Sequence, residues 1–367
     1  MMEDMPRIPL VDVSRQFAML EEEAGGAVLE VLRSGGYILG PRVAELESEI
    51  ASYLGVAEGV GVASGTDALF LSLKALGVGP GDEVLTTPFT FIATAEAAAN
   101  LGAVPRFVDI EGATFNIDAG LVADAITEQT KALVVVHLFG HPVDVEACRK
   151  ICDERGIALV EDCAQSLGAE AAGQKAGSFG EASALSFFPT KNLGAAGDAG
   201  MLCTDDEGLA ARSRMLRAHG SSRKYYHEVL GYNSRLDAVQ AALLLVKLKH
   251  LDEWNRERAR IASLYDAHLK DVVTPPVKPG YSHCYHQYTI RSHRRDEVKS
   301  GLEAAGVASA VYYPVPLHFQ PCFEYLGYSR GEFPVAEAAS GEVLSLPIFP
   351  GMTDEEVERV CQAVNGA

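Results

Sequence analysis

Short apolar segments alternate with stretches of helical periodicity from about residue 55 to residue 220. Several of these segments are hydrophobic at consecutive positions, which is typical of parallel strands that are covered on both faces. Helical patterns lie between them at residues 67–76, 93–101 and 143–154. The alternation predicts an α/β domain with a mostly parallel, seven-stranded sheet flanked by helices. The strands are expected at Val60–Ala63, Glu83–Thr86, Val104–Val108, Ala132–His137, Ala158–Glu161, Ala184–Phe187 and Gly200–Thr204.

A long helical pattern follows at residues 236–269, apolar at its start and highly charged towards its end. We expect one helix there, which leaves the main core and bridges to a second unit. Beyond the Pro-rich segment VVTPPVKPGYSH, the pattern predicts a strand at Gln287–Arg291 and helices at Arg295–Ala305 and Thr353–Asn365. The chain is therefore expected to have a large α/β domain at residues 1–245 and a small α+β domain at residues 246–367.

Composition narrows the class of protein. With 367 residues, of which 48% are apolar, the chain can form a large core. The net charge of −19 would repel the phosphates of DNA or RNA, so no nucleic-acid partner is expected. No apolar run approaches the roughly 18 residues of a membrane helix, so no membrane partner is expected. The start, MMEDMPRIPLVDV, lacks the features of a signal peptide, which favours a cytoplasmic protein.

Cysteine and histidine positions argue against a metal site. Seven scattered cysteines without a CxxC pair predict neither a disulfide framework nor structural zinc, and they fit a reducing cytoplasm. His137 and His141 have the spacing HxxxH, which could bind zinc on a helix. Here they straddle a strand end and a loop with Gly and Pro, so no metal is expected.

The segment GVASGTDALFLSLKAL combines a strand end, a turn of small residues and a helix start. Gly65 and Thr66 open the helix, where free N–H groups and the positive end of the helix dipole suit a phosphate. Ser64, Thr66 and Asp67 equally suit ordinary helix capping, so the turn alone leaves both interpretations open. The chain has no Gly-Lys pair of a P-loop, and its glycines do not match the dinucleotide spacing GxGxxG.

Two further segments place charged residues after predicted strands. Asp162, in IALVEDCAQSLGAE, ends a strand where open α/β sheets bind their ligands, and it could either pair with a cationic ring nitrogen or cap the next helix. Lys191, in SALSFFPTKNLGAAGDAGM, precedes a loop of small residues. A buried lysine with a lowered pKa can act as the nucleophile of Schiff-base chemistry, although most lysines are solvated at the surface. The order of phosphate turn, strand-end Asp and later Lys favours the chemical interpretation.

With these segments the chain resembles the DegT/DnrJ/StrS-type sugar aminotransferases. The resemblance runs from SGGYILGPRVAELESEIA to YYPVPLHFQ, and it rests on the motifs SGTDAL, TPFTFIATAEA, HLFGHPVD, EDCAQSLGA, SFFPTKNLGAAGDAG and GYNSRLDAVQAALL. It implies the fold of aspartate aminotransferase (PLP fold type I), with a smaller C-terminal α+β domain. It also implies the cofactor pyridoxal 5'-phosphate (PLP) and a homodimer with shared active sites.

The resemblance implies roles for individual residues. Lys191 would form the Schiff base with the cofactor and move the proton, and Asp162 would pair with the pyridinium nitrogen. Gln165 would hydrogen-bond the ring hydroxyl oxygen, and Phe91 would stack on the ring. The phosphate would be bound by residues of both subunits: Gly65, Thr66 and Ser186, with Asn233 from the neighbouring subunit. Taken singly, Phe91 could also be a core aromatic, and Ser186 and Asn233 could be turn residues.

The resemblance also indicates the substrates, a keto sugar on a nucleotide and L-glutamate as the amino donor. The stretch VYYPVPLHFQPCF is similar to relatives that act on 3-keto sugars linked to UDP or dTDP, in which Tyr313 and His318 would contact sugar or diphosphate. Tyr37 is a candidate on the nucleotide side, and Arg235 could either meet a substrate carboxylate or pair with Asp237. A 4-keto sugar is the alternative. The product would enter surface-polysaccharide or glycoside biosynthesis.

Other functions are less favoured. A lyase or an amino-acid aminotransferase of the same fold would need an arginine motif for an α-carboxylate, which the C-terminal part lacks. A non-catalytic, PLP-binding regulatory protein would not need the retained Lys191, Asp162 and Gln165. The glycine spacing disfavours a nicotinamide dehydrogenase. Relatives that remove a hydroxyl group carry His at the lysine position, so Lys191 favours aminotransfer.

Overall fold

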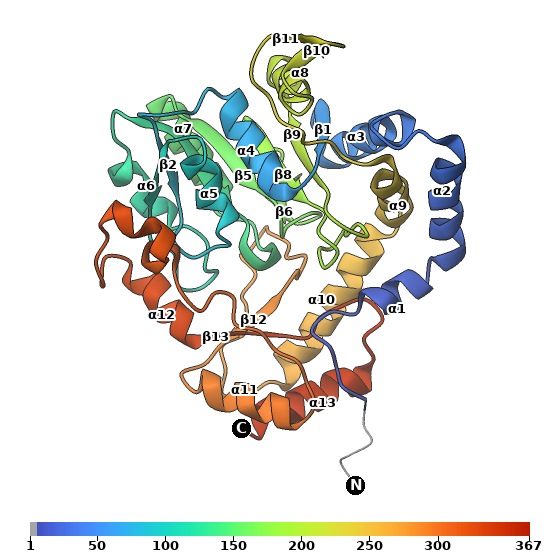
Figure 1. Ribbon diagram of the computed structural model, residues 1–367. Coiled ribbons are helices and arrows are strands. Elements are labelled where there is room, and N and C mark those ends of the chain that lie inside the picture. Colours follow the sequence, from blue (N-terminus) through green and yellow to red (C-terminus); the bar gives the residue numbers. More distant parts are fainter. Residues whose placement is uncertain (1–5) are drawn as a thin grey trace.

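The computed structural model describes residues 6–367 (Figure 1). The first five residues, which begin the segment examined for a signal peptide, lie outside the described part. Three helices precede the sheet: α1 (Val13–Ala18), α2 (Glu21–Ser34) and α3 (Pro41–Leu54). Both α2 and α3 pack against α9 (Ala238–Leu248), at the right of Figure 1. Helices α2 and α3 thus cover one side of the large unit.

A seven-stranded sheet forms the centre of the large unit, as predicted. Only β9 runs antiparallel to its neighbours, so the sheet is mostly parallel. Each strand lies within two residues of its expected bounds. In spatial order the strands are β1 (Glu58–Val62), β9 (Gly200–Thr204), β8 (Ala182–Ser186), β5 (Ala158–Asp162), β4 (Thr130–Val136), β2 (Glu83–Thr86) and β3 (Val104–Phe107).

Both faces of the sheet are buried under helices, which explains the continuous apolar strands. One face, with Val134 and Val160, packs against α4 (Gly65–Ala75), α5 (Ala93–Ala99) and α8 (Glu207–Leu216). The other face, with Leu133 and Leu159, packs against helices that include α6 (Ala119–Ala125) and α7 (Val145–Arg155). Neighbouring residues of one strand point to opposite faces, so each strand contributes to both cores.

The prediction of a single long helix at residues 236–269 is wrong. The chain forms α9 and then α10 (Leu251–His268), with a break at Lys249 and His250. The apolar α9 is held in the core beside α2 and α3, whereas α10 packs against α13 of the C-terminal region. One straight helix could not pack against α2 and α3 at its start and against α13 at its end. The helix therefore breaks at Lys249 and His250, although the helical pattern of the sequence continues through these residues.

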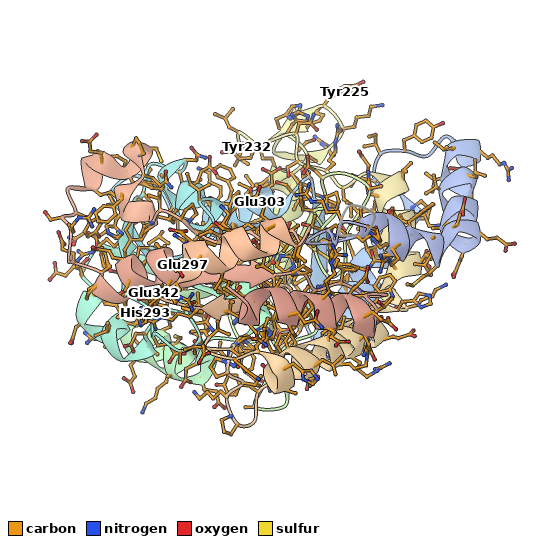
Figure 2. All side chains as sticks on the ribbon, turned by 90° about the horizontal axis from the view of Figure 1, so that it is seen from below. Tyr225, Tyr232, His293, Glu297, Glu303 and Glu342 are labelled. Atoms are coloured by element: carbon orange, nitrogen blue, oxygen red, sulfur yellow. The ribbon has the colours of Figure 1, made fainter. Side chains whose placement is uncertain are left out.

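The C-terminal region contains an antiparallel strand pair and several helices. β12 (Tyr288–Arg291) pairs with β13 (Val343–Leu346), and α11 (Arg295–Ala304) and α13 (Asp354–Asn365) pack on this pair. Strand β13 and α12 (Pro334–Glu342) were not predicted. Glu297 and Glu303 of α11 are exposed, as Figure 2 shows, in line with the acidic composition.

Short elements complete the described part of the chain: β6 (Glu170–Ala171), β7 (Gln174–Lys175), β10 (Ser221–Arg223), β11 (Tyr226–His227), and the 3-10 helices Leu138–Gly140, Leu317–Phe319 and Pro321–Leu326. All seven cysteines are free thiols, and only Cys322 is exposed. Within residues 6–367, no helix has the length and apolar character needed to cross a bilayer.

Candidate active site

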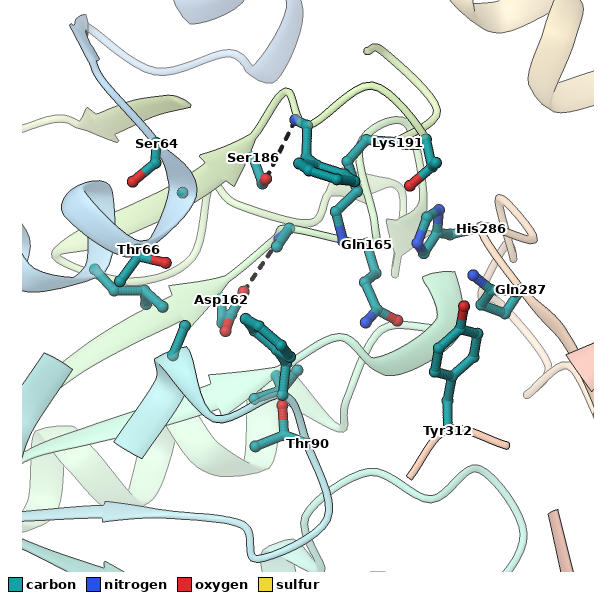
Figure 3. A pocket seen from close by; sticks show the side chains of 18 of the residues that line it. Ser64, Thr66, Thr90, Asp162, Gln165, Ser186, Lys191, His286, Gln287 and Tyr312 are labelled. Atoms are coloured by element: carbon teal, nitrogen blue, oxygen red, sulfur yellow. Dashed lines mark hydrogen bonds between the residues drawn. The ribbon is translucent and has the colours of Figure 1, made fainter. Parts of the chain in front are cut away.

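A cavity of about 680 Å³ opens at the carboxyl ends of the parallel strands, where α/β folds commonly bind ligands. Its walls come from the β1–α4 turn, the ends of β5 and β8, and segments of the C-terminal region (Figure 3). The fold therefore brings together residues that are more than 200 positions apart. The predicted site residues that line this cavity are Gly65, Thr66, Phe91, Asp162, Gln165, Ser186, Lys191 and Tyr313.

The start of α4 and the end of β8 meet at one end of the cavity. Ser64 caps α4 by accepting a hydrogen bond from the Asp67 N–H at 3.1 Å, so the capping interpretation holds for this residue. The N–H groups of Gly65 and Thr66 occupy the first two helical positions and have no acceptor within the helix. A Cβ atom on Gly65 would lie 2.6 Å from Cβ of Ser186. Glycine thus permits the close approach that places Ser186 beside the helix N-terminus.

Asp162 lies at the end of β5 and is 5% exposed. Its Oδ2 accepts a hydrogen bond from Thr94 Oγ1 at 2.8 Å, and its Oδ1 accepts one from the Ala164 N–H at 3.1 Å. Burial raises the pKa of Asp162, while these two donors and the charge of Lys191 act in the opposite direction. A cationic partner would favour the ionised form and offset the cost of burying this carboxylate.

Lys191 follows β8 and points its amine into the cavity. No hydrogen bond to the described chain holds this amine. Burial lowers the pKa of Lys191 to about 8, and the Asp162 carboxylate opposes the shift. The neighbouring Asn192 anchors the loop, because its Nδ2 donates to Asn255 Oδ1 at 2.7 Å and to the Cys284 carbonyl at 2.9 Å. The result is a free amine on a fixed backbone, with an increased neutral fraction near neutral pH.

Aromatic and amide side chains line the cavity beside Asp162. Gln165 accepts a hydrogen bond from the Phe139 N–H at 2.7 Å and donates one to Tyr313 Oη at 3.1 Å. Burial raises the pKa of Tyr313, so its phenol stays protonated. Phe91 is 54% exposed, with its ring centre 6.5 Å from that of Tyr313. An aromatic ring this exposed is part of the cavity wall and does not fill the core.

Four predicted residues do not line the cavity of this chain. Asn233 lies in a groove on the outer side of α4, which it shares with Thr66. Tyr37 is exposed and donates a hydrogen bond to the Leu32 carbonyl, and Arg235 is half-buried without an ion pair to Asp237. His318 is buried against Phe333, with its Nε2 3.4 Å from Glu337 Oε1.

Several side chains at the site were not predicted. Thr94 donates a hydrogen bond to the Asp162 carboxylate. In the motif TPFTFIATAEA nothing distinguishes Thr94 from the other small residues of an Ala-rich helix. His286, Gln287 and Tyr312 line the cavity from the C-terminal region. Gln287 is the first residue of the predicted strand and His286 precedes it, so nothing in the local pattern marked either residue for chemistry.

His137 forms a buried pair with Glu161, with 2.9 Å between Nε2 and Oε2. The Glu161 carboxylate also accepts the N–H groups of Gly177, Phe179 and Gly180. Nδ1 of His137 accepts the Val143 N–H at 3.1 Å, which leaves the proton on Nε2. Cys163 lies close enough to complete a possible ligand set, but the histidine and the carboxylate already have protein partners. This network joins the ends of β4 and β5 at Glu161, the residue before Asp162.

The residues of the cavity fit PLP. The cofactor needs an amine for its aldehyde, an acid for its ring nitrogen and donors for its phosphate. Lys191 supplies the amine, the buried and hydrogen-bonded Asp162 supplies the acid, and the start of α4 with Ser186 supplies the donors. Phe91 offers an exposed aromatic ring in the same cavity.

Comparison with known proteins agrees with this chemistry. The family model described as the DegT/DnrJ/EryC1/StrS aminotransferase family matches residues 18–365. A pleiotropic regulatory protein of Geobacillus stearothermophilus is 49% identical over 97% of both chains. A UDP-N-acetyl-3-dehydro-alpha-D-glucosamine 3-aminotransferase of Acidithiobacillus ferrooxidans is 46% identical, also over 97% of both chains.

Among solved structures, DesV of S. venezuelae in complex with a ketimine intermediate has a TM-score of 0.96 and 42% identity, over 99% of this chain and 98% of that chain. The match extends over the large unit and the C-terminal region alike. Aminotransferases of this family depend on PLP. The chain belongs to the DegT/DnrJ/EryC1/StrS family of PLP-dependent sugar aminotransferases.

Proposed function

We propose that this aminotransferase transfers the amino group of L-glutamate to carbon 3 of a 3-keto sugar carried on UDP or dTDP. The observation that carries the proposal is the convergence of Lys191, Asp162 and the α4 N-terminus on one cavity. The preference for carbon 3 is supported by the 46% identity to a relative named as a UDP-sugar 3-aminotransferase. A 4-keto sugar is the alternative, because the residues that fit the cofactor would serve either ketone.

Lys191 and Asp162 would have separate roles in the reaction. Lys191 would hold the cofactor covalently and, once displaced by the incoming amine, would take the α-proton of the substrate and return a proton later. Its lowered pKa favours the neutral amine that this step needs. Asp162, oriented by Thr94, would keep the ring nitrogen protonated. When bound, the cofactor supplies the electron-poor ring that stabilises negative charge at the deprotonated carbon.

Gln165 and Phe91 would fix the plane of the ring. The Gln165 amide is held between the Phe139 N–H and Tyr313 Oη, so its remaining N–H is in a defined position for an oxygen acceptor. Phe91 would lie against the ring face. Tyr313 would contact the sugar next to that position, since it lines the same cavity. We propose no direct substrate contact for His318, whose ring is enclosed by neighbouring aromatic side chains.

We further propose a homodimer in which Asn233 completes the phosphate site of the partner subunit. In the isolated chain Asn233 lies exposed on the outer side of α4, and it does not line its own cavity. The hairpin of β10 and β11 exposes Tyr225 at 81%, the segment that follows it exposes Leu230 at 94%, and Figure 2 shows Tyr225 at the edge of the molecule. Tyr37 and Arg235 do not line the cavity of their own chain, so we propose that they too would reach the substrate of the partner subunit. Apolar exposure of this kind supports an interaction surface.

The division into two domains near residue 245 remains part of the proposal. It is supported by separate cores, since α9 belongs to the core of the large unit while the later part of α10 belongs to the C-terminal core. The seven free thiols support a reducing, cytoplasmic setting.

Two half-reactions test the proposed function. L-Glutamate should convert the PLP-loaded protein to its pyridoxamine form, seen as loss of the visible absorbance band. A panel of 3-keto and 4-keto sugars on UDP, dTDP and GDP should then show which compound restores the band. Restoration by 3-keto compounds supports the proposal, and restoration by 4-keto compounds alone supports the alternative. The regulatory name of one relative makes a third outcome informative: cofactor binding without either half-reaction would indicate a non-catalytic protein.

A further inference from the structure

His286 is a polar side chain of the cavity that the cofactor roles leave unused. It is 3% exposed and lines the wall contributed by the C-terminal region. Figure 3 shows His286, Gln287 and Tyr312 at the end of the cavity opposite Ser64 and Thr66. Nδ1 of His286 is buried and has no hydrogen-bond partner in the described chain. Buried polar atoms are rarely left unpaired, so this one calls for a partner that binds in the cavity.

The backbone before His286 is held in an unusual conformation. Tyr285 has φ +47°, a left-handed value that costs free energy for a residue with a side chain. The His283 ring stacks on the Tyr285 ring at 4.0 Å between centres, and His283 Nδ1 accepts the Tyr285 N–H at 2.9 Å. Arg258 Nη1 donates to the Tyr285 carbonyl at 3.1 Å. Three contacts thus maintain a turn that directs His286 to the cavity wall.

The surroundings keep His286 uncharged. Burial lowers its pKa well below the ordinary value, and the positive charges of Lys191 and Arg258 act in the same direction. A neutral imidazole has one donor and one acceptor, and it does not attract phosphate or carboxylate as a cation would. Gln287 and Tyr312 beside it are likewise uncharged groups that can donate and accept. This wall therefore suits hydroxyl groups.

We propose that His286, together with Gln287 and Tyr312, holds the sugar ring of the amino acceptor through hydrogen bonds to its hydroxyl groups. The inference rests on the proposed function, because it names which part of the nucleotide sugar this wall binds. The contact would turn the keto carbon towards Lys191, which lies between this wall and the phosphate end of the cavity. The unpaired nitrogen of His286 would gain its partner only when the acceptor binds.

The test separates the two half-reactions in a variant that cannot form the hydrogen bond. His286→Leu should lower kcat/KM for the keto sugar by roughly 5- to 100-fold, the effect expected when a buried hydrogen bond to a substrate is lost. The glutamate half-reaction and the affinity for PLP should stay within about twofold of wild type. His286→Asn, which keeps a donor and an acceptor, should recover part of the loss. His293→Leu is the matched control, since His293 is exposed, lies beside Glu342 and does not line the cavity (Figure 2).

Acceptors that lack the hydroxyl at carbon 4 or at carbon 6 make the test specific. Wild type and His286→Leu should react equally well with the analogue that lacks the contacted hydroxyl. Equal kcat/KM with the complete sugar, the same loss with every analogue, or an equal loss with glutamate would each overturn the inference. If wild type itself reacts with glutamate but with no keto sugar, the proposed function fails, and that result is distinct from a failure of His286 alone.

Discussion

Adding one methyl group at Gly65 should damage the phosphate end of the cavity. In Gly65→Ala, the new Cβ would lie 2.6 Å from Cβ of Ser186, about 0.8 Å inside the 3.4 Å at which ordinary contact begins. The nearby Ser186 Cα, at 3.1 Å, prevents relief by a side-chain rotation alone. The start of α4 and the end of β8 must therefore move apart. Overpacking of this kind costs about 1–3 kcal/mol of stability.

The same displacement should weaken PLP binding. The N–H groups of Gly65 and Thr66 and the hydroxyl of Ser186 cannot all reach one phosphate after the shift. A hydrogen bond to a charged group contributes about 1.5–3 kcal/mol, so the loss of one should raise Kd for PLP roughly 10- to 150-fold. Isothermal titration calorimetry of the cofactor-free protein with PLP measures the change in Kd.

Two controls assign the effect to the phosphate. Pyridoxal, which lacks the phosphate, should bind wild type and Gly65→Ala with nearly equal affinity. Gly79→Ala should change nothing, because no atom lies within 4 Å of the position of its Cβ. If Gly65→Ala bound PLP as tightly as wild type, the phosphate would not lie between α4 and Ser186, and our assignment of this end of the cavity would be refuted.

Three further predictions concern the amine and its acid. Lys191→Ala should keep the circular dichroism spectrum of the wild type but lose turnover, and wild-type turnover would contradict the role of this lysine. Because the pKa of Lys191 is lowered to about 8, the rate at which the cofactor-free protein attaches PLP should rise with pH to a midpoint near 8, not near the ordinary 10.5. Asp162→Asn removes the negative charge that raises the pKa of Lys191, so the midpoint measured for this variant should be lower than that of wild type. Thr94→Val leaves Asp162 without its 2.8 Å donor, which should raise the pKa of Asp162 further. Loss of this buried hydrogen bond should raise the activation free energy by about 1–3 kcal/mol and so lower kcat/KM roughly 5- to 150-fold, whereas an unchanged value in steady-state assays would show that Thr94 does not orient the acid.

Local sequence pattern determined the sheet, because a strand buried on both faces needs consecutive apolar residues whatever its neighbours are. It also placed Asp162 at the end of β5, and Gly65 and Lys191 shortly after β1 and β8; the carboxyl ends of these three strands meet at one edge of the sheet. The motif resemblance then supplied the family and the cofactor. These predictions depend on segments of a few residues, and so they could be made without the tertiary structure.

Other features depended on contacts between distant parts of the chain. The helical pattern of residues 236–269 is continuous, and only the need to pack α9 on the large unit and α10 on the C-terminal core breaks the helix at His250. Thr94 is an ordinary helix residue until the fold places Asp162 next to its hydroxyl. His286 lies 95 positions after Lys191 and reaches the same cavity only because the Tyr285 turn is held by His283 and Arg258. A residue pattern reflects the local requirements of one segment, such as burial on one or both faces. The roles of the side chains in this cavity wall depend instead on contacts between distant segments, which form only in the folded chain.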